Sequence, residues 1–165
     1  MRHRVLERFP ERVYTREEVE KAKEFINKGY KHRLRIKGSP EFKRKVRDAL
    51  KIVKSAGYYD FLRTYIRSIK EIDGLTQLRE SEASIWANKY AVENPVDAAS
   101  LFIQKAIHMQ EYVDGKLYYG GTAEKLSTEK RIEFLETLKK KCRNKKVKEE
   151  CEKLLKFWSE STLVY

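Results

Sequence analysis

Apolar side chains recur at helical spacing through the first half of this chain, and a glycine follows each of the first three stretches. A stripe with a period near 3.6 residues is buried only when a helix packs it against another element, so this pattern constrains the fold more than any other feature. The glycines are Gly29, Gly57 and Gly74. The apolar positions before them are Val19, Ala22, Phe25 and Ile26, then Phe42, Val46, Ala49, Leu50 and Val53, then Phe61, Leu62, Tyr65, Ile66, Ile69 and Ile72. The pattern predicts three amphipathic helices, each ended by its glycine.

Each of these stretches also begins with a residue that can cap a helix. Thr15 is followed three positions later by Glu18, which is the spacing of a capping box. Ser39 precedes Pro40, and proline fits the first turn of a helix because its missing N–H has no partner there. Asp60 is the third cap. The start and stop signals therefore agree for all three helices.

Residues 32–38, between the first two helices, alternate instead of repeating at helical spacing. Leu34 and Ile36 are apolar, and they alternate with the basic residues Arg33, Arg35 and Lys37. A period of two is typical of a strand with one buried face. The sequence therefore predicts one clear strand here.

The remainder of the chain is predicted to be helical with one interruption. Helical spacing predicts a fourth helix from Thr76 to about Glu93, and Asn94 with Pro95 ends it and caps a fifth helix. The Asp-Gly pair within residues 112–119 indicates a loop with a short strand, or a small hairpin. Residues 128–160 are expected to form an antiparallel helical hairpin. The predicted fold class is mainly α with a minor β component, in a single compact domain over residues 1–165.

Length and composition place the chain in a broad class. A chain of 165 residues fits one domain. Charged residues make up 38% of the chain, a share typical of the ion-pair networks of thermophile proteins. Apolar runs stay short of the roughly 20 residues that a membrane span needs, and the first residues lack the apolar centre of a signal peptide. We therefore expect a cytoplasmic thermophile protein without membrane association.

The two cysteines, Cys142 and Cys151, lie on either side of a predicted turn between two helices. Two thiols alone do not make a zinc site. Their placement allows them to face each other across a helical hairpin, and thermophile cytosols tolerate disulfides. A disulfide and a pair of free, half-buried thiols are both compatible with the sequence.

Positive charge is concentrated in the first 70 residues. They contain 21 Lys or Arg against 9 Asp or Glu, whereas residues 71–165 contain 16 of each, so the whole net charge of +12 belongs to the N-terminal part. Such a concentration raises the local concentration of polyanions. A basic surface that is simply solvated is the alternative interpretation. A second basic cluster, seven Lys or Arg within residues 139–148, is expected at the tip of the terminal hairpin.

The segment around Glu80 resembles the third-ligand helix of gluzincin metallopeptidases. In that family a Glu ligand is followed by small residues three and seven positions later, and Glu80, Ala83 and Ala87 keep this spacing. Ser84 stands where the family commonly has Asp. Residues 32–57 are also similar to the strand and helix that precede the metal helix in compact zincin-like proteins. The resemblance implies a zincin-like scaffold.

The zinc site itself is incomplete in the sequence. The family requires H-E-x-x-H, in which two imidazoles one helical turn apart hold zinc and the Glu activates its water. The three histidines are His3, His32 and His108, and no two of them have that spacing. The sequence also lacks a phosphate-binding glycine loop and a nucleophile elbow. We therefore expect no catalytic residues, no bound metal and no cofactor.

Residues 32–72 also resemble ribbon-helix-helix DNA-binding proteins. The order of strand, proline near a helix start, Gly-Tyr and a second helix with Tyr65, Ile66 and Arg67 is similar to that family. The resemblance implies a homodimer whose paired strands place Arg33, Arg35 and Lys37 in the major groove, with phosphate held at the start of the following helix. In the family the strand usually begins the chain, whereas a helix comes first here.

Charge and resemblance together favour a non-catalytic protein that binds DNA or RNA through its N-terminal third. The predicted contact residues are Arg33, Arg35, Lys37, Lys43, Arg44 and Arg47. The alternative is a degenerate zincin-like relative without metal, acting as a structural or protein-interaction module, for example of a mobile genetic element.

Overall fold

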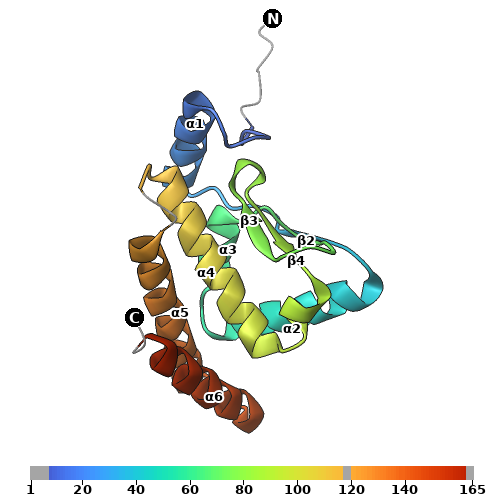
Figure 1. Ribbon diagram of the computed structural model, residues 1–165. Helices are drawn as coiled ribbons and strands as arrows, with labels where there is room; N and C mark the ends of the chain where they lie inside the picture. Colours follow the sequence, from blue (N-terminus) through green and yellow to red (C-terminus); the bar gives the residue numbers. More distant parts are fainter. Residues whose placement is uncertain (1–7, 117–119, 163–165) are drawn as a thin grey trace, which may run out of the picture.

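The computed structural model describes residues 8–116 and 120–162, which form a mainly helical domain with one small sheet (Figure 1). The helices are α1 (Arg16–Asn27), α2 (Pro40–Ser55), α3 (Tyr59–Tyr65), α4 (Pro95–Val113), α5 (Gly121–Lys141) and α6 (Lys145–Thr162). The strands are β1 (Arg35–Lys37), β2 (Ser68–Glu71), β3 (Gln77–Arg79) and β4 (Ser84–Ala87). Two short 3-10 helices, η1 (Glu80–Glu82) and η2 (Lys89–Val92), flank β4. The predicted fold class, mainly α with a minor β component, is confirmed.

The predicted caps Thr15, Ser39 and Asn94 are present, whereas the prediction of Asp60 as a cap is wrong. Asp60 lies inside α3, which begins at Tyr59 and has no side-chain cap. The Thr15 hydroxyl accepts a hydrogen bond from the Glu18 N–H at 3.2 Å, and the Glu18 carboxylate accepts one from the Thr15 N–H at 2.8 Å. The Ser39 hydroxyl accepts from the Phe42 N–H at 3.2 Å. The Asn94 side chain accepts from two N–H groups in the first turn of α4. Each bond satisfies a donor that the first turn of a helix leaves without a partner.

The sheet has the strand order β1-β2-β4-β3. β1, β2 and β4 run parallel, and β3 is antiparallel to β4. The parallel connection from β1 to β2 passes through the helices α2 and α3. The connection from β2 to β4 passes through strand β3 and the short 3-10 helix η1. β1 and β3 are therefore the edges of this four-stranded sheet.

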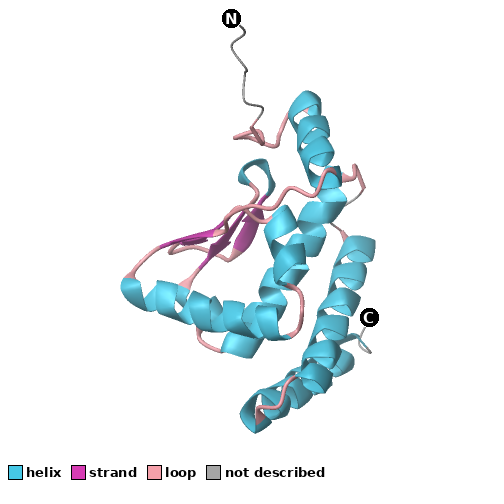
Figure 2. Cartoon of the chain, turned by 180° about the vertical axis from the view of Figure 1, so that it is seen from behind, coloured by secondary structure: helices cyan, strands magenta, loops and turns pink. Residues whose placement is uncertain are grey.

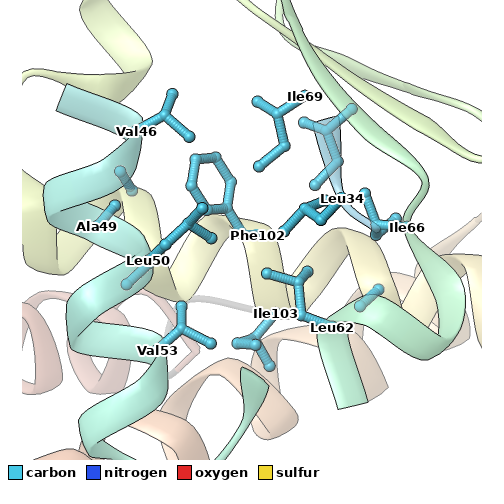
Figure 3. Packing of buried hydrophobic residues seen from close by; sticks show 14 of the residues in the cluster. Leu34, Val46, Ala49, Leu50, Val53, Leu62, Ile66, Ile69, Phe102 and Ile103 are labelled. Carbon is cyan, nitrogen blue, oxygen red and sulfur yellow. The ribbon is translucent and has the colours of Figure 1, made fainter. Parts of the chain in front are cut away.

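The core lies between one face of the sheet and the helices α2, α3 and α4 (Figure 2). Ile69 of β2 points toward Val46 of α2 and Phe102 of α4, and Leu62 of α3 lies beside Ile103 (Figure 3). α4 packs against α1, α2, α3, α5 and η2. It is thus the central element that joins the sheet to the C-terminal helices.

Two predicted helices are corrected by the structure. The prediction of a helix from Thr76 to Glu93 is wrong, because this segment forms β3, η1, β4 and η2. The third predicted helix ends at Tyr65, and β2 takes up residues 68–71. In both segments the isoleucines fit a strand as well as a helix, and pairing with the neighbouring strands decides the outcome.

The C-terminal hairpin is confirmed, with α5 beginning already at Gly121. Residues 112 and 113 belong to α4, and residues 117–119 of the predicted short strand or hairpin lie outside the described residues. Cys142 and Cys151 are free thiols, with Cys151 buried in the core. Among the described residues, no helix is both long enough and apolar enough to cross a bilayer.

Candidate nucleic-acid interface

The face of the sheet that points away from α2 and α4 is formed by two rows of side chains. Successive residues of a strand point to opposite faces. The row of Ile36, Ile69, Ile85 and Leu78 faces the core, so the rows on either side of it point outward. These rows are Arg35, Ser68, Ser84 and Arg79, and Lys37, Lys70, Trp86 and Gln77. We call these two rows the outer sheet face.

Cations from all but one of the strands meet on this face. Arg35 and Lys37 come from β1, Lys70 from β2 and Arg79 from β3, and all are exposed. Lys37 and Lys70 are direct partners in the register of β1 and β2. Like charges placed opposite each other repel, so the fold maintains this arrangement at a cost in stability.

Little negative charge lies near these cations. The Glu82 carboxylate is 4.0 Å from Nε of Arg79, and both side chains are half exposed to water, so this ion pair is weak. Glu71 belongs to the row that points to the other face, where its carboxylate accepts a hydrogen bond from the Ser39 N–H at 2.8 Å. The outer sheet face therefore keeps a positive charge that is suited to an anionic partner.

Two serines form the floor between Arg35 and Arg79. The hydroxyl oxygens of Ser68 and Ser84 are 2.8 Å apart, and the Ser84 hydroxyl is 3.1 Å from the Ser68 carbonyl oxygen. Both serines are buried. Their small polar side chains are thus hydrogen-bonded to each other.

Trp86 lies in the central part of the outer sheet face. It is paired in register with Lys70 on one side and Gln77 on the other. The guanidinium carbon of Arg79 is 4.3 Å from the centre of the Trp86 ring, and Nζ of Lys70 is 5.2 Å from it. Both contacts are in the range of cation–π interactions. The indole is partly exposed and has cations from two neighbouring strands beside it.

The structure brings together only some of the basic residues that the sequence singled out. Arg35 and Lys37 lie on the outer sheet face. Arg33 is exposed but precedes β1, and Leu34 between them has φ of 40°, in the left-handed region. The alternation over residues 33–37 is therefore not that of one continuous strand.

Lys43, Arg44 and Arg47 lie on α2, the helix that covers the inner face of the sheet. Arg44 and Arg47 are exposed, and Lys43 is half-buried. The Arg44 guanidinium lies between the carboxylates of Glu41 and Asp48, at 3.9 and 3.8 Å. These residues form a second basic surface that is separate from the outer sheet face.

Sequence reasoning missed Lys70, Arg79 and Trp86, because both segments were assigned to helices. The signal that could have found Lys70 and Trp86 is the alternation in Ser68-Ile69-Lys70 and in Ser84-Ile85-Trp86. In each triplet one isoleucine is buried and its neighbours face outward. Such short alternating runs indicate strands when two of them can pair.

The predicted cluster at residues 139–148 lies at the α5–α6 turn, as expected. Lys139 forms an ion pair with Glu152 at 3.4 Å, and Nζ of Lys141 donates to the Ala56 carbonyl oxygen at 3.4 Å. Some of these cations thus have partners within the molecule. The Lys139–Glu152 ion pair connects α5 to α6, and the Lys141 hydrogen bond connects α5 to the end of α2.

The two segments that carry the family resemblances have a different local structure from the one that each family implies. Glu80 lies in η1, Ala83 has φ of 52° and Ala87 ends β4, so these residues do not share one helix. β1 pairs in parallel with β2 of the same chain. The resemblances to gluzincins and to ribbon-helix-helix proteins, and the homodimer that the second implies, stay predictions.

A buried polar network joins α4, α5 and α6. The Arg131 side chain of α5 donates hydrogen bonds to Asp97 Oδ1 at 2.6 Å, to Gln104 Oε1 at 2.7 Å and to Ser100 Oγ at 2.9 Å. Its guanidinium carbon lies 4.3 Å from the ring centre of Trp158 in α6. Arg131 is 5% exposed, and the Asp97 carboxylate is the anionic partner that compensates its buried charge.

His108 follows Gln104 by one turn of α4 and is also buried. Its Nε2 atom is 3.9 Å from a carboxylate oxygen of Glu124 in α5, beyond hydrogen-bonding distance. Burial, and next the Lys105 ammonium, lower the pKa of His108, while Glu124 opposes them. Within residues 8–116 and 120–162, no three His, Cys, Asp or Glu side chains converge as a metal site.

Comparisons with known proteins give no match to this chain, whether with protein-family models, with curated proteins or with solved structures.

Proposed function

We propose that this protein binds nucleic acid through the outer sheet face. The observation that carries the proposal is the convergence of four exposed cations, Arg35, Lys37, Lys70 and Arg79, on a face that α2 and α4 leave open. Phosphate contacts from Arg and Lys supply most of the affinity of such interfaces.

The proposed set of contact residues differs from the set predicted from the sequence. Arg35 and Lys37 are retained as contact residues, and Lys70 and Arg79 are added. Lys43, Arg44 and Arg47 belong to the second surface on α2, where a long polyanion can reach them from the end of β1, because α2 begins directly after Gly38 and Ser39. Arg33 lies next to β1 and can contribute from the loop. DNA and RNA share the phosphate chemistry used here.

Fluorescence anisotropy with labelled single- and double-stranded DNA and RNA, over a salt series, tests the proposal. We expect the observed affinity to fall linearly with the logarithm of salt concentration, with a slope of about 0.7 to 0.9 for each phosphate contacted. The double substitution Arg35→Gln, Lys37→Gln should reduce affinity about tenfold at low salt and lower the slope by about 1.4 to 1.8.

Two matched controls remove the same amount of charge elsewhere. Lys125→Gln with Lys156→Gln changes exposed residues of α5 and α6 and should leave the affinity within about twofold. The pair Arg44→Gln and Arg47→Gln measures how much of the affinity for nucleic acid depends on α2. Equal losses from all three pairs would show that only net charge matters, and no binding at low salt would refute the proposal.

A degenerate zincin-like scaffold is the second candidate, acting as a structural or interaction module without catalysis. The observation that favours it is the segment from Gln104 to His108 on α4, which has the length and helical spacing of H-E-x-x-H but begins with Gln and has Lys105 in place of the Glu. Glu124 of α5 lies beside His108. On this reading α4, and not the segment of Glu80, is the former metal helix.

The substitution Gln104→His tests the second candidate, because it places two imidazoles one helical turn apart next to Glu124. We expect this variant to bind Zn²⁺ in competition with a chromophoric chelator, and the unmodified protein to bind it at least about tenfold more weakly. Gln110→His is the control, since Gln110 faces Tyr65 on α3. Equal zinc affinity in both variants would contradict the zincin-like reading.

A further inference from the structure

We propose that Trp86 is a stacking site for an unpaired nucleobase, so that the outer sheet face selects single strands over duplexes. This inference rests on the proposed nucleic-acid binding and adds the class of ligand. Cations alone account for attraction to any polyanion, whereas an indole among them provides a surface for the flat face of a base.

The position of Trp86 is the first argument. Strand β4 is an inner strand, with β2 and β3 on its two sides, so the sheet holds the Trp86 backbone from both directions. Its side chain lies on the face opposite to the core, although burial in that core would be the favoured place for so large an apolar group. It remains only partly buried.

The contacts of the ring are the second argument. They include the charged ends of Arg79 and Lys70, which are exposed. A cation–π contact at an exposed site is weak and can be exchanged. A base that stacks on the indole meets Arg79, whose planar guanidinium also stacks on bases, and the Lys70 ammonium stays beside it for the phosphate.

The arrangement of charge around Trp86 is the third argument. Lys37 lies two strands away in the same row, about 10 Å at the usual spacing of strands. Arg35 lies on the same strand as Lys37. A chain whose base occupies Trp86 therefore passes cations on β2 and β1 along one row, which suits a backbone that crosses the strands.

The shape of the sheet argues against a duplex as the preferred ligand. Three inter-strand spacings make a sheet of about 14 Å, whereas the major groove of B-DNA is about 12 Å wide and admits a helix or a two-stranded ribbon. In a duplex the base faces are also covered by their neighbours. A duplex can thus contact these cations only through phosphates, without using Trp86.

Two oligonucleotides of equal charge test the inference with the unmodified protein. One is a labelled oligo-dT of about twelve nucleotides, and the other has the same phosphates and sugars but no bases. We expect the oligo-dT to bind more tightly by about 5- to 150-fold, the range for stacking of one base. The Trp86→Leu variant should lose this preference, and Trp86→Phe should keep part of it.

Fluorescence gives an independent readout, because the chain has two tryptophans. In a Trp158→Phe background Trp86 is the sole tryptophan, and we expect saturating oligo-dT to quench its emission while the oligonucleotide without bases does not. Equal affinity for both oligonucleotides, or binding without quenching, would overturn the stacking site and leave the proposed function intact. If neither oligonucleotide nor a duplex binds at low salt, both proposals fail.

Discussion

The most unusual single residue outside the proposed interface is His32. It is 2% exposed, and the rings of Phe9 and Tyr30 contact its imidazole edge-on, with centroids 4.5 and 5.1 Å away. Its Nε2 atom has no hydrogen-bond partner among the described residues. Burial, and next the Arg67 guanidinium, lower the pKa of His32 from 6.5 to about 4. The folded protein therefore holds this imidazole neutral.

This shift predicts a loss of stability in mild acid. The unfolded chain takes up a proton on His32 as the pH falls through about 6.5, whereas the folded protein takes it up only near pH 4. The contribution of His32 to the free energy of unfolding is thus fully present above about pH 6.5 and declines toward pH 4. Its size is on the order of 3 kcal/mol.

Urea denaturation between about pH 8 and pH 4 measures this contribution, with His32→Phe as the comparison. The variant keeps an aromatic ring but cannot be protonated, so its unfolding free energy should depend less on pH in this window. Carboxylates and His108 titrate in both proteins and cancel in the difference. Parallel pH profiles for the two proteins would show that His32 does not resist protonation in the folded state.

At the scale of elements, the sequence correctly predicts those helices whose ends are determined by neighbouring residues. α1, α2 and the start of α4 are foreseen because Thr15, Ser39 and Asn94 are caps whose side chains bond to nearby N–H groups. These interactions span only three residues. They act in the same way whatever the rest of the chain does, so sequence reasoning finds them.

The central strands could not be predicted in this way. β2 follows α3 after only two residues, and Ile66, Ile69 and Ile72 fit a helical stripe. β2 is stabilised by β1 on one side and β4 on the other, at sequence separations that no local pattern reports. The same argument applies to β4, whose Ile85 is buried between Ile69 and Leu78.

Because strands β2, β3 and β4 were predicted as helices, the residues of the candidate site that lie on them were also missed. With residues 60–93 assigned to helices, Lys70, Arg79 and Trp86 had no reason to lie beside Arg35 and Lys37. Only the strand order places them on one face. The part of the interface on β1 was predictable because the alternation of Arg35, Ile36 and Lys37 is local, whereas the part on β2, β3 and β4 depends on tertiary pairing.

At the scale of the whole molecule, the chain divides into a basic part around the sheet and a neutral part that ends in the α5–α6 hairpin. α4 belongs to both, since its Phe102 and Ile103 face the sheet core (Figure 3). Its Asp97, Ser100 and Gln104 accept hydrogen bonds from Arg131. The buried Arg131 network is the most deeply buried of the polar connections between the hairpin and the remainder, which include the hydrogen bonds from Lys141 to Ala56 and from Asn94 to Glu150. Its loss should weaken the link between the two parts.

The substitution Arg131→Met tests this connection. It keeps the length of the side chain but leaves Asp97, Ser100 and Gln104 without their donor, and we expect a loss of about 2–4 kcal/mol in unfolding free energy. Lys130→Met is the matched control. Its ammonium forms only a surface ion pair with Glu133 at 3.2 Å, so its loss should cost less than about 1 kcal/mol.

The two tryptophans show whether the molecule also loses cooperativity, because Trp86 reports on the sheet and Trp158 on α6. With one of them replaced by Phe in turn, urea unfolding of the otherwise unmodified protein should give coincident transitions, as expected for one cooperative domain. In the Arg131→Met background the Trp158 transition should precede that of Trp86, since the hairpin has lost its buried anchor to α4. Coincident transitions in that background would show that apolar packing between α4 and α5, through residues such as Phe134 and Leu135, suffices to keep the whole chain in one unit.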